Sequence, residues 1–135
     1  MMNSKLLVLA SLILASILVS GCTSQSQTDG ANASAEKVKI SFEITANGST
    51  ESKIVEAGKG SNAFEVMKAN FQLEYNETAY GAFIQSINGI NAGNDEYWAL
   101  YVNGAYADKG INQYTLEKDT KIEWKIEKVD LSGFS

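Results

Sequence analysis

The sequence has no histidine and no proline, and Cys22 is its only cysteine. Without histidine, the chain lacks the side chain that most often serves as a general base at neutral pH. A Ser/His/Asp or Cys/His nucleophilic site is therefore excluded, as is a zinc site built from histidine and several cysteines. A lone cysteine also excludes a disulfide within the chain.

Arginine is missing as well, because all eleven basic residues are lysine, and sixteen acidic residues give the chain a formal charge of −5. An acidic chain lacks the clustered positive charge that holds nucleic acid or an anionic lipid surface. The absence of arginine removes the side chain that binds phosphate or carboxylate through two parallel hydrogen bonds. We therefore expect no nucleic-acid partner.

An apolar run over 6–19 follows Lys5 and leads into Ser20-Gly21-Cys22. A helix needs about 20 apolar residues to cross a bilayer, so this shorter run is typical of a cleaved signal. Small residues before a cysteine indicate a lipoprotein cleavage site, and the cysteine then receives a diacylglycerol. We expect residues 1–21 to be a lipoprotein signal peptide and Cys22 to anchor the protein in the cell membrane, facing the extracytoplasmic side. The alternative is an ordinary secretory signal that leaves Cys22 as a free thiol.

Residues 22–36 are small and polar and show no apolar period. Such a segment buries too little surface to offset the conformational entropy lost on folding, which predicts a flexible tether. The folded domain is expected over 37–130, followed by a tail over 131–135. This length suits one domain with an adequate but modest core.

The domain opens with a predicted hairpin. Apolar and polar residues alternate over 38–45, which predicts a strand with one buried face. Asn47-Gly48 favours a tight turn because both residues tolerate positive φ, and a second strand through 53–55 returns from it.

A short helix is predicted within 61–71, where the apolar residues change to helical spacing. Asn62 and Glu65 fit a capping box at its start. Further strands are predicted in FQLEY, AFIQSI, YWALYV and TKIEWKIEKV. This order indicates an α+β domain whose helix packs on an antiparallel or mixed sheet, and it is compatible with a β-grasp arrangement.

The last two predicted strands each carry one tryptophan. In the final strand, Trp124 alternates with lysines and glutamates whose opposite charges can pair on an exposed face. In YWALYV, Trp98 alternates with Tyr97 and Tyr101. We expect both tryptophans to be buried on the side of the sheet that the helix covers.

Tyr97 and Tyr101 lie on one face of their strand with Ala99 between them. Two tyrosines across a small residue suit an amphipathic ligand, because they offer apolar rings with hydroxyls at the margin. An ordinary sheet core is the alternative. A concave, exposed pair favours the ligand, whereas full burial favours the core.

Acidic residues offer two further kinds of site. The pairs Asp95–Glu96 and Glu74–Glu77 could supply the carboxylates of a glycosidase, and 91–96 contains oxygen ligands that suit calcium. Solvated loop acids explain the same residues, and the spacing in 91–96 does not match an EF-hand loop. We therefore expect neither an enzyme nor a metal site.

The order SNAFEVMKANF, FIQSINGI, YWALYVNG, Gly110 and LEKDTKIEWKI resembles the transcobalamin-like C-terminal domain family. The resemblance covers residues 38–128 and departs from the family at Lys118-Asp119, where a Gly-Asp turn is more usual. In the animal cobalamin carriers, this domain closes over a corrinoid that a separate helical barrel holds. We do not expect such a barrel in this sequence. Many prokaryotic relatives are surface lipoproteins or adhesin-like modules.

Together, the leader, the tyrosine pair and the resemblance predict a noncatalytic, lipid-anchored binding module for a small amphipathic ligand, and the resemblance suggests a corrinoid as that ligand. Tyr97 and Tyr101 would contact such a ligand, and Asn91 and Asn103 would donate hydrogen bonds to it. The chain has no histidine to serve as an axial ligand of a corrinoid, and we expect no cofactor of its own. The alternative is a surface protein-interaction, structural or adhesion module without a small ligand.

Overall fold

The computed structural model describes residues 35–134. The predictions for the signal peptide over 1–21, for Cys22 and for nearly all of the tether lie outside these residues. Within the described part of the chain, no helix is both long and apolar enough to cross a membrane.

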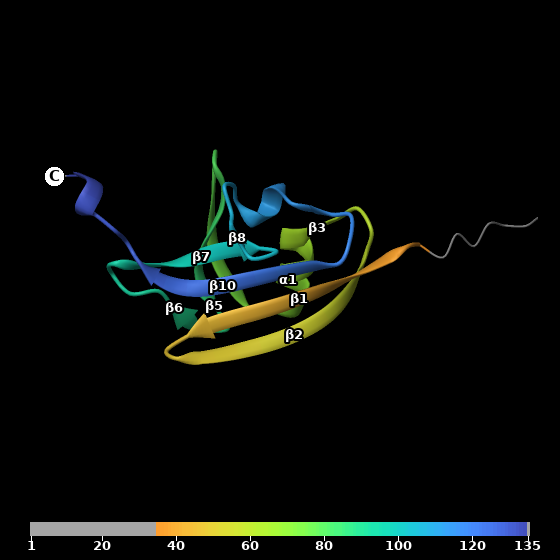
Figure 1. Cartoon of the computed structure of the whole chain (residues 1–135), viewed down its shortest axis with the longest axis horizontal. Helices are drawn as coiled ribbons and strands as arrows, with labels where there is room; N and C mark the ends of the chain where they lie inside the picture. Colours follow the sequence, from red (N-terminus) through yellow and green to blue (C-terminus); the bar gives the residue numbers. More distant parts are fainter. Residues whose placement is uncertain (1–34, 135) are drawn as a thin grey trace, which may run out of the picture. The chain divides into compact units, whose positions relative to one another are not determined.

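A five-stranded mixed sheet forms one layer of the domain (Figure 1). Strand β1 runs parallel to β10, whereas the other neighbouring strands are antiparallel. The first and last long strands of the domain therefore lie side by side within one sheet. In spatial order the strands are β2 (Ser49–Gly58), β1 (Lys37–Ala46), β10 (Thr120–Lys128), β7 (Glu96–Val102) and β8 (Ala105–Tyr106).

Asn-Gly pairs form the tight turns of the sheet. Asn47-Gly48 joins β1 to β2, and Asn103-Gly104 joins β7 to β8. Both residues of each pair have positive φ, as the favoured two-residue hairpin turns require. The turn predicted at Asn47-Gly48 is confirmed.

The helix α1 (Ala63–Asn70) begins where predicted. The side-chain oxygen of Asn62 accepts hydrogen bonds from the backbone N–H groups of Phe64 and Glu65, at 3.0 and 3.3 Å. This confirms Asn62 as the N-cap. The carboxylate of Glu65 pairs with Lys68 at 2.7 Å, so it faces along the helix rather than back toward the cap.

Shorter strands complete the domain. β4 (Leu73–Thr78), β5 (Gly81–Ile87) and β6 (Ile90–Asn91) form a three-stranded sheet, and β3 (Ser61–Asn62) pairs with β9 (Thr115–Leu116). Two 3-10 turns span Ile111–Gln113 and Ser132–Phe134. The described residues thus form a small, mostly β domain with one α-helix, which confirms the predicted α+β class.

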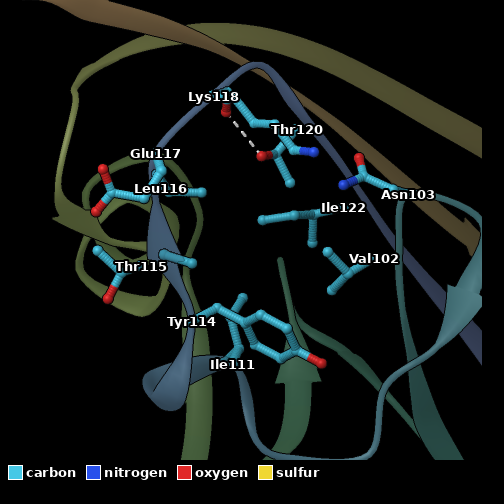
Figure 2. A pocket seen from close by; sticks show the side chains of 11 residues that line it. Val102, Asn103, Ile111, Tyr114, Thr115, Leu116, Glu117, Lys118, Thr120 and Ile122 are labelled. Atoms are coloured by element: carbon cyan, nitrogen blue, oxygen red, sulfur yellow. Dashed lines mark hydrogen bonds between the residues drawn. The ribbon is translucent and has the colours of Figure 1, made fainter.

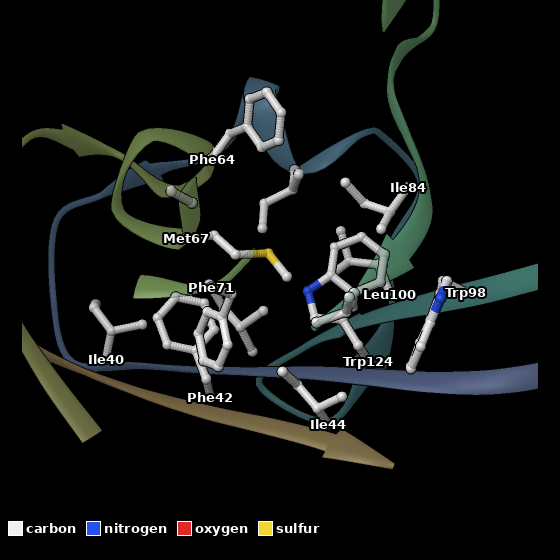
Figure 3. Close-up of a cluster of buried hydrophobic side chains, with 14 of the residues drawn as sticks. Ile40, Phe42, Ile44, Phe64, Met67, Phe71, Ile84, Trp98, Leu100 and Trp124 are labelled. Atoms are coloured by element: carbon white, nitrogen blue, oxygen red, sulfur yellow. The ribbon is translucent and has the colours of Figure 1, made fainter. Parts of the chain in front are cut away.

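The core lies between the large sheet and α1, and both tryptophans belong to it (Figure 3). Trp98 and Trp124 are 4% and 3% exposed and share one buried cluster with Phe64 and Met67 of α1. The register explains this: Trp124 pairs with Leu100 and Ile126 with Trp98, so these side chains point to one face. The predicted burial of both tryptophans is confirmed.

The opposite face of β10 carries the predicted charge pairs. Lys121 contacts Glu43 across the strands at 3.0 Å and Glu123 along its own strand at 3.3 Å, and Lys125 also contacts Glu123, at 3.4 Å. Glu123 is buried beneath these contacts rather than solvated. Its two lysine partners compensate for the loss of hydration.

Candidate functional site

Tyr97, Tyr101 and Tyr106 lie close together at the β7–β8 edge of the large sheet, on the face that carries the lysine–glutamate pairs. Tyr97 and Tyr101 point away from α1, because they alternate with Trp98 and Leu100 of the core. Tyr106 of β8 pairs with Tyr101 in register, and their rings pack edge to face with centroids 5.5 Å apart.

Glu127 binds the hydroxyls of this cluster. Tyr101 donates to one carboxylate oxygen of Glu127 at 2.6 Å, and Tyr97 donates to the other at 3.4 Å. Tyr106 donates in turn to the Tyr97 hydroxyl at 3.4 Å. The hydrogen bond with Tyr106, and then burial, raise the pKa of Tyr97, while the hydrogen bond to Glu127 raises the pKa of Tyr101. The hydroxyls of Tyr97 and Tyr101 are thus engaged in hydrogen bonds within the protein.

The exposure of Tyr97 and Tyr101 falls between the two expected extremes. Both are half-buried, and Ala99 between them is buried, so it forms no open floor. Lys125 covers the Tyr101 ring, with its ammonium 4.6 Å from the ring centroid. Of the two predicted tyrosines, Tyr97 is therefore the one whose neighbours form a candidate binding surface.

Three adjoining surface hollows meet at Phe83 of β5. Tyr97 and Tyr106 line a hollow of 160 Å³ with it, and Tyr97 and Asn91 line another of 350 Å³. The third, of 420 Å³, lies beside Tyr80 and Tyr106. Three of these aromatic side chains are unusually exposed: Phe83 at 51%, Tyr106 at 58% and Tyr80 at 89%. We call Tyr80, Phe83, Tyr97 and Tyr106 the aromatic surface.

The structure therefore brings the predicted residues Tyr97 and Asn91 together, around a residue that sequence reasoning missed. Phe83 carried a signal, because it alternates with the buried residues Ala82 and Ile84 and so lies on the outer face of its strand. A single exposed apolar residue is common, so this signal becomes informative only when the fold places Tyr80, Tyr97 and Tyr106 beside the same hollows. Tyr80 and Tyr106 lie near turns, where no period exists to single them out.

Asn103, the fourth predicted residue, lies at a different cavity (Figure 2). It has positive φ in the β7–β8 turn, where its side-chain oxygen accepts from the backbone N–H of Lys121 at 2.9 Å. Its own N–H donates to the Lys121 carbonyl at 2.8 Å. These bonds fasten the turn to the start of β10. The cavity beside it measures 240 Å³ and has mainly aliphatic walls.

A hydrogen bond within the acidic loop 91–96 fixes the conformation of that loop. A carboxylate oxygen of Glu96 accepts the backbone N–H of Gly93 at 3.1 Å. Over residues 35–134, no three residues of the metal-binding types histidine, cysteine, aspartate and glutamate gather in one place.

Two solved structures share the fold of this domain. Haptocorrin, solved in complex with Cbi, matches with a TM-score of 0.60 and 22% identity, over 71% of this chain and 26% of haptocorrin. A proposed metal binding protein from Ruminococcus gnavus ATCC 29149 matches with a TM-score of 0.60 and 11% identity, over 70% of this chain and 99% of that one. The chain thus spans about a quarter of haptocorrin but almost all of the bacterial protein.

No curated protein matches the sequence. The likeness to haptocorrin confirms, at the level of the fold, the resemblance to the transcobalamin-like domain. Residues 60–128 match the family described as "Domain of unknown function (DUF4430)". This match covers half of the sequence and includes α1, the aromatic surface and β10. The chain belongs to the DUF4430 family.

Proposed function

We propose that this chain is a lipid-anchored, extracytoplasmic binding module with a β-grasp-like fold, and that it holds a corrinoid against the aromatic surface. The observation that supports the proposal most strongly is the position of Phe83, a half-exposed aromatic residue that lines all three hollows. The fold shared with haptocorrin, a protein solved with Cbi, supports the choice of ligand class.

The shape of the aromatic surface suits a broad, flat ligand. A corrin ring is too large for any one of the three hollows, but it can lie across them and cover exposed aromatic rings, which removes apolar area from water. Asn91, Glu74 and Glu96 line the 350 Å³ hollow and can bond to the amide groups at the rim of a corrinoid. An open surface buries less of a ligand than a closed pocket, so the affinity should be modest.

Titration with cobinamide and cobalamin tests this function. Full-length protein carrying Cys22→Ser is titrated by calorimetry, and the fluorescence of Trp98 and Trp124 is followed in parallel. Both indoles are buried, so their quenching reports energy transfer to the corrinoid rather than direct contact. We expect the double variant Phe83→Ala/Tyr106→Ala to weaken binding at least about tenfold, because tenfold in Kd corresponds to about 1.4 kcal/mol and a single hot-spot aromatic residue contributes about 2 kcal/mol or more.

Ile54→Ala is the matched control. Ile54 is an exposed apolar residue on β2, at the opposite edge of the sheet from β8. Its removal should leave the affinity unchanged. Equal affinity in the double variant, or no binding by the parent at millimolar corrinoid, would refute the function and favour a protein-interaction module.

The lipid anchor needs its own test. Cys22→Ser removes the thiol that would receive the diacylglycerol, so the protein should move from the membrane fraction to the soluble fraction of its native host. Thr23→Ala, which alters the next residue and keeps the thiol, should stay with the membrane. Retention of the Cys22→Ser protein in washed membranes would argue against the anchor.

A further inference from the structure

The cavity beside Asn103 has an apolar interior. It lies between the start of α1, the segment leading into β9, and the facing ends of β7 and β10 (Figure 2). The ring of Tyr114 forms part of one wall, and Lys109 covers this ring, with its ammonium 4.6 Å from the centroid. Aliphatic side chains form the remaining wall: Ala63, Val102, Ile111, Leu116 and Ile122.

This cavity is separate from the aromatic surface. Ile111 is the residue that lines both this cavity and the nearest hollow of that surface, and its side chain is fully buried between them. A ligand in one of the two places therefore leaves the other free.

Two hydrogen-bond donors stand at one end of the apolar walls. In Figure 2 the side chain of Lys118 runs across this end of the cavity toward Asn103. The side-chain oxygen of Asn103 already accepts from the Lys121 backbone, so its amide nitrogen remains as the donor, and Figure 2 shows that nitrogen on the side of the cavity. The carboxylate of Glu117 points away from the cavity in the same view.

The charge of Lys118 is not matched within the described residues. The acids beside it in sequence do not pair with it: Asp119 accepts the backbone N–H of Lys39 at 2.8 Å, and Glu117 faces away. The backbone of Lys118 is held in place, because its carbonyl accepts the Thr120 hydroxyl at 2.8 Å. Among residues 35–134, the lysines that form ion pairs are others: Lys37, Lys59, Lys68, Lys121 and Lys125.

We propose that this cavity is a second binding site, which takes a small carboxylate with an apolar tail. The tail occupies the space between Val102, Leu116 and Ile122, and the carboxylate accepts hydrogen bonds from Lys118 and Asn103. A dry apolar cavity of about 150 Å³ holds one benzene molecule. The 240 Å³ observed here therefore accommodates one six-membered ring with a short linker to the charged group.

The probe is 3-phenylpropionate, and its uncharged match is 3-phenylpropanamide. Both are titrated into full-length Cys22→Ser protein by calorimetry and by NMR with ¹⁵N-labelled protein. We expect the acid to bind with a Kd of about a millimolar, a modest affinity for a ligand of this size in a partly open cavity. Its shift changes should centre on Val102, Leu116 and Ile122, and the amide should bind several-fold more weakly.

Two variants test separately the contribution of the Lys118 charge and the need for an open cavity. Lys118→Gln should weaken binding of the acid about three- to tenfold and leave the amide unaffected, because only the acid uses the positive charge. Val102→Phe fills the cavity with a side chain that strands tolerate, so it should abolish binding of both probes while the melting temperature stays near that of the parent. Lys128→Gln, which removes an exposed lysine at the far end of β10, is the control and should change nothing.

The site is refuted if the acid fails to bind at 10 mM or if its NMR shifts map to Phe83 and Tyr106 instead. Equal affinity for acid and amide, or an unchanged affinity in Lys118→Gln, refutes recognition of the carboxylate. Saturating cobinamide should not displace the acid, so this result stands or falls independently of the corrinoid proposal.

Discussion

Trp124→Ala should lower the free energy of unfolding by about 3–5 kcal/mol, the usual cost of truncating a large buried aromatic residue. Trp124 is 3% exposed and belongs to the same buried cluster as Phe64 and Met67 of α1. Because a domain of this size has a total stability of about 5–15 kcal/mol, the variant should melt at least about 12 °C lower, or fail to fold. Thermal unfolding followed by circular dichroism measures the shift.

Phenylalanine variants at the two tryptophans separate packing from hydrogen bonding. The indole N–H of Trp98 donates to the Ile90 carbonyl at 3.3 Å, whereas that of Trp124 finds no partner among the described residues. Trp98→Phe should therefore be more destabilising than Trp124→Phe, by about 0.5–1.5 kcal/mol for the lost hydrogen bond. An unmoved melting transition in Trp124→Ala would show that the last strand presents its other face to the core.

Gly81→Ala should destabilise the domain by about 2–6 kcal/mol, which combines backbone strain with overpacking. Gly81 has a φ of +121°, a conformation that side chains rarely adopt. A Cβ atom there would lie 2.8 Å from the Cα atom of Gly110 and 2.9 Å from the side-chain oxygen of Asn112. That oxygen accepts the backbone N–H of Ala82 at 3.0 Å, so the methyl group would push β5 away from the 3-10 turn at Ile111–Gln113.

Gly89→Ala provides the matched control for strain. Gly89 also has positive φ, at +80°, but a Cβ atom there would meet nothing within 4 Å. It should cost only about 1–2 kcal/mol for the left-handed conformation. Chemical denaturation of both variants measures the difference. Equal losses would mean that the close approach of Gly81 to Gly110 relaxes without cost.

Gly81 also connects stability to the proposed function. It lines the 420 Å³ hollow together with Tyr80 and Phe83. We expect Gly81→Ala to weaken corrinoid binding even at temperatures where the variant remains folded. The added methyl group displaces β5, and Phe83 belongs to the same strand.

From the sequence alone, interactions between residues a few positions apart determined the turns, the helix cap and the buried face of the strands. The Asn47-Gly48 turn, the cap at Asn62 and the burial of Trp98 and Trp124 all follow from what each residue requires of its immediate neighbours. Periods of two and 3.6 likewise assign side chains to faces without knowledge of the partner strand. The α+β class was predictable because these local signals agree.

The tertiary structure alone decided which residues form a site. Strands β1 and β10 pair in parallel although most of the domain separates them in sequence, and no period in either strand specifies that partner. The same long-range packing brings Phe83 beside Tyr97, and Lys118 to the end of the cavity at Asn103. Of the four predicted residues, Tyr97 and Asn91 thus line the hollows at Phe83, Asn103 lines the separate cavity, and Tyr101 lines neither. A sequence pattern shows which face of a strand a side chain takes but not what the fold places next to it.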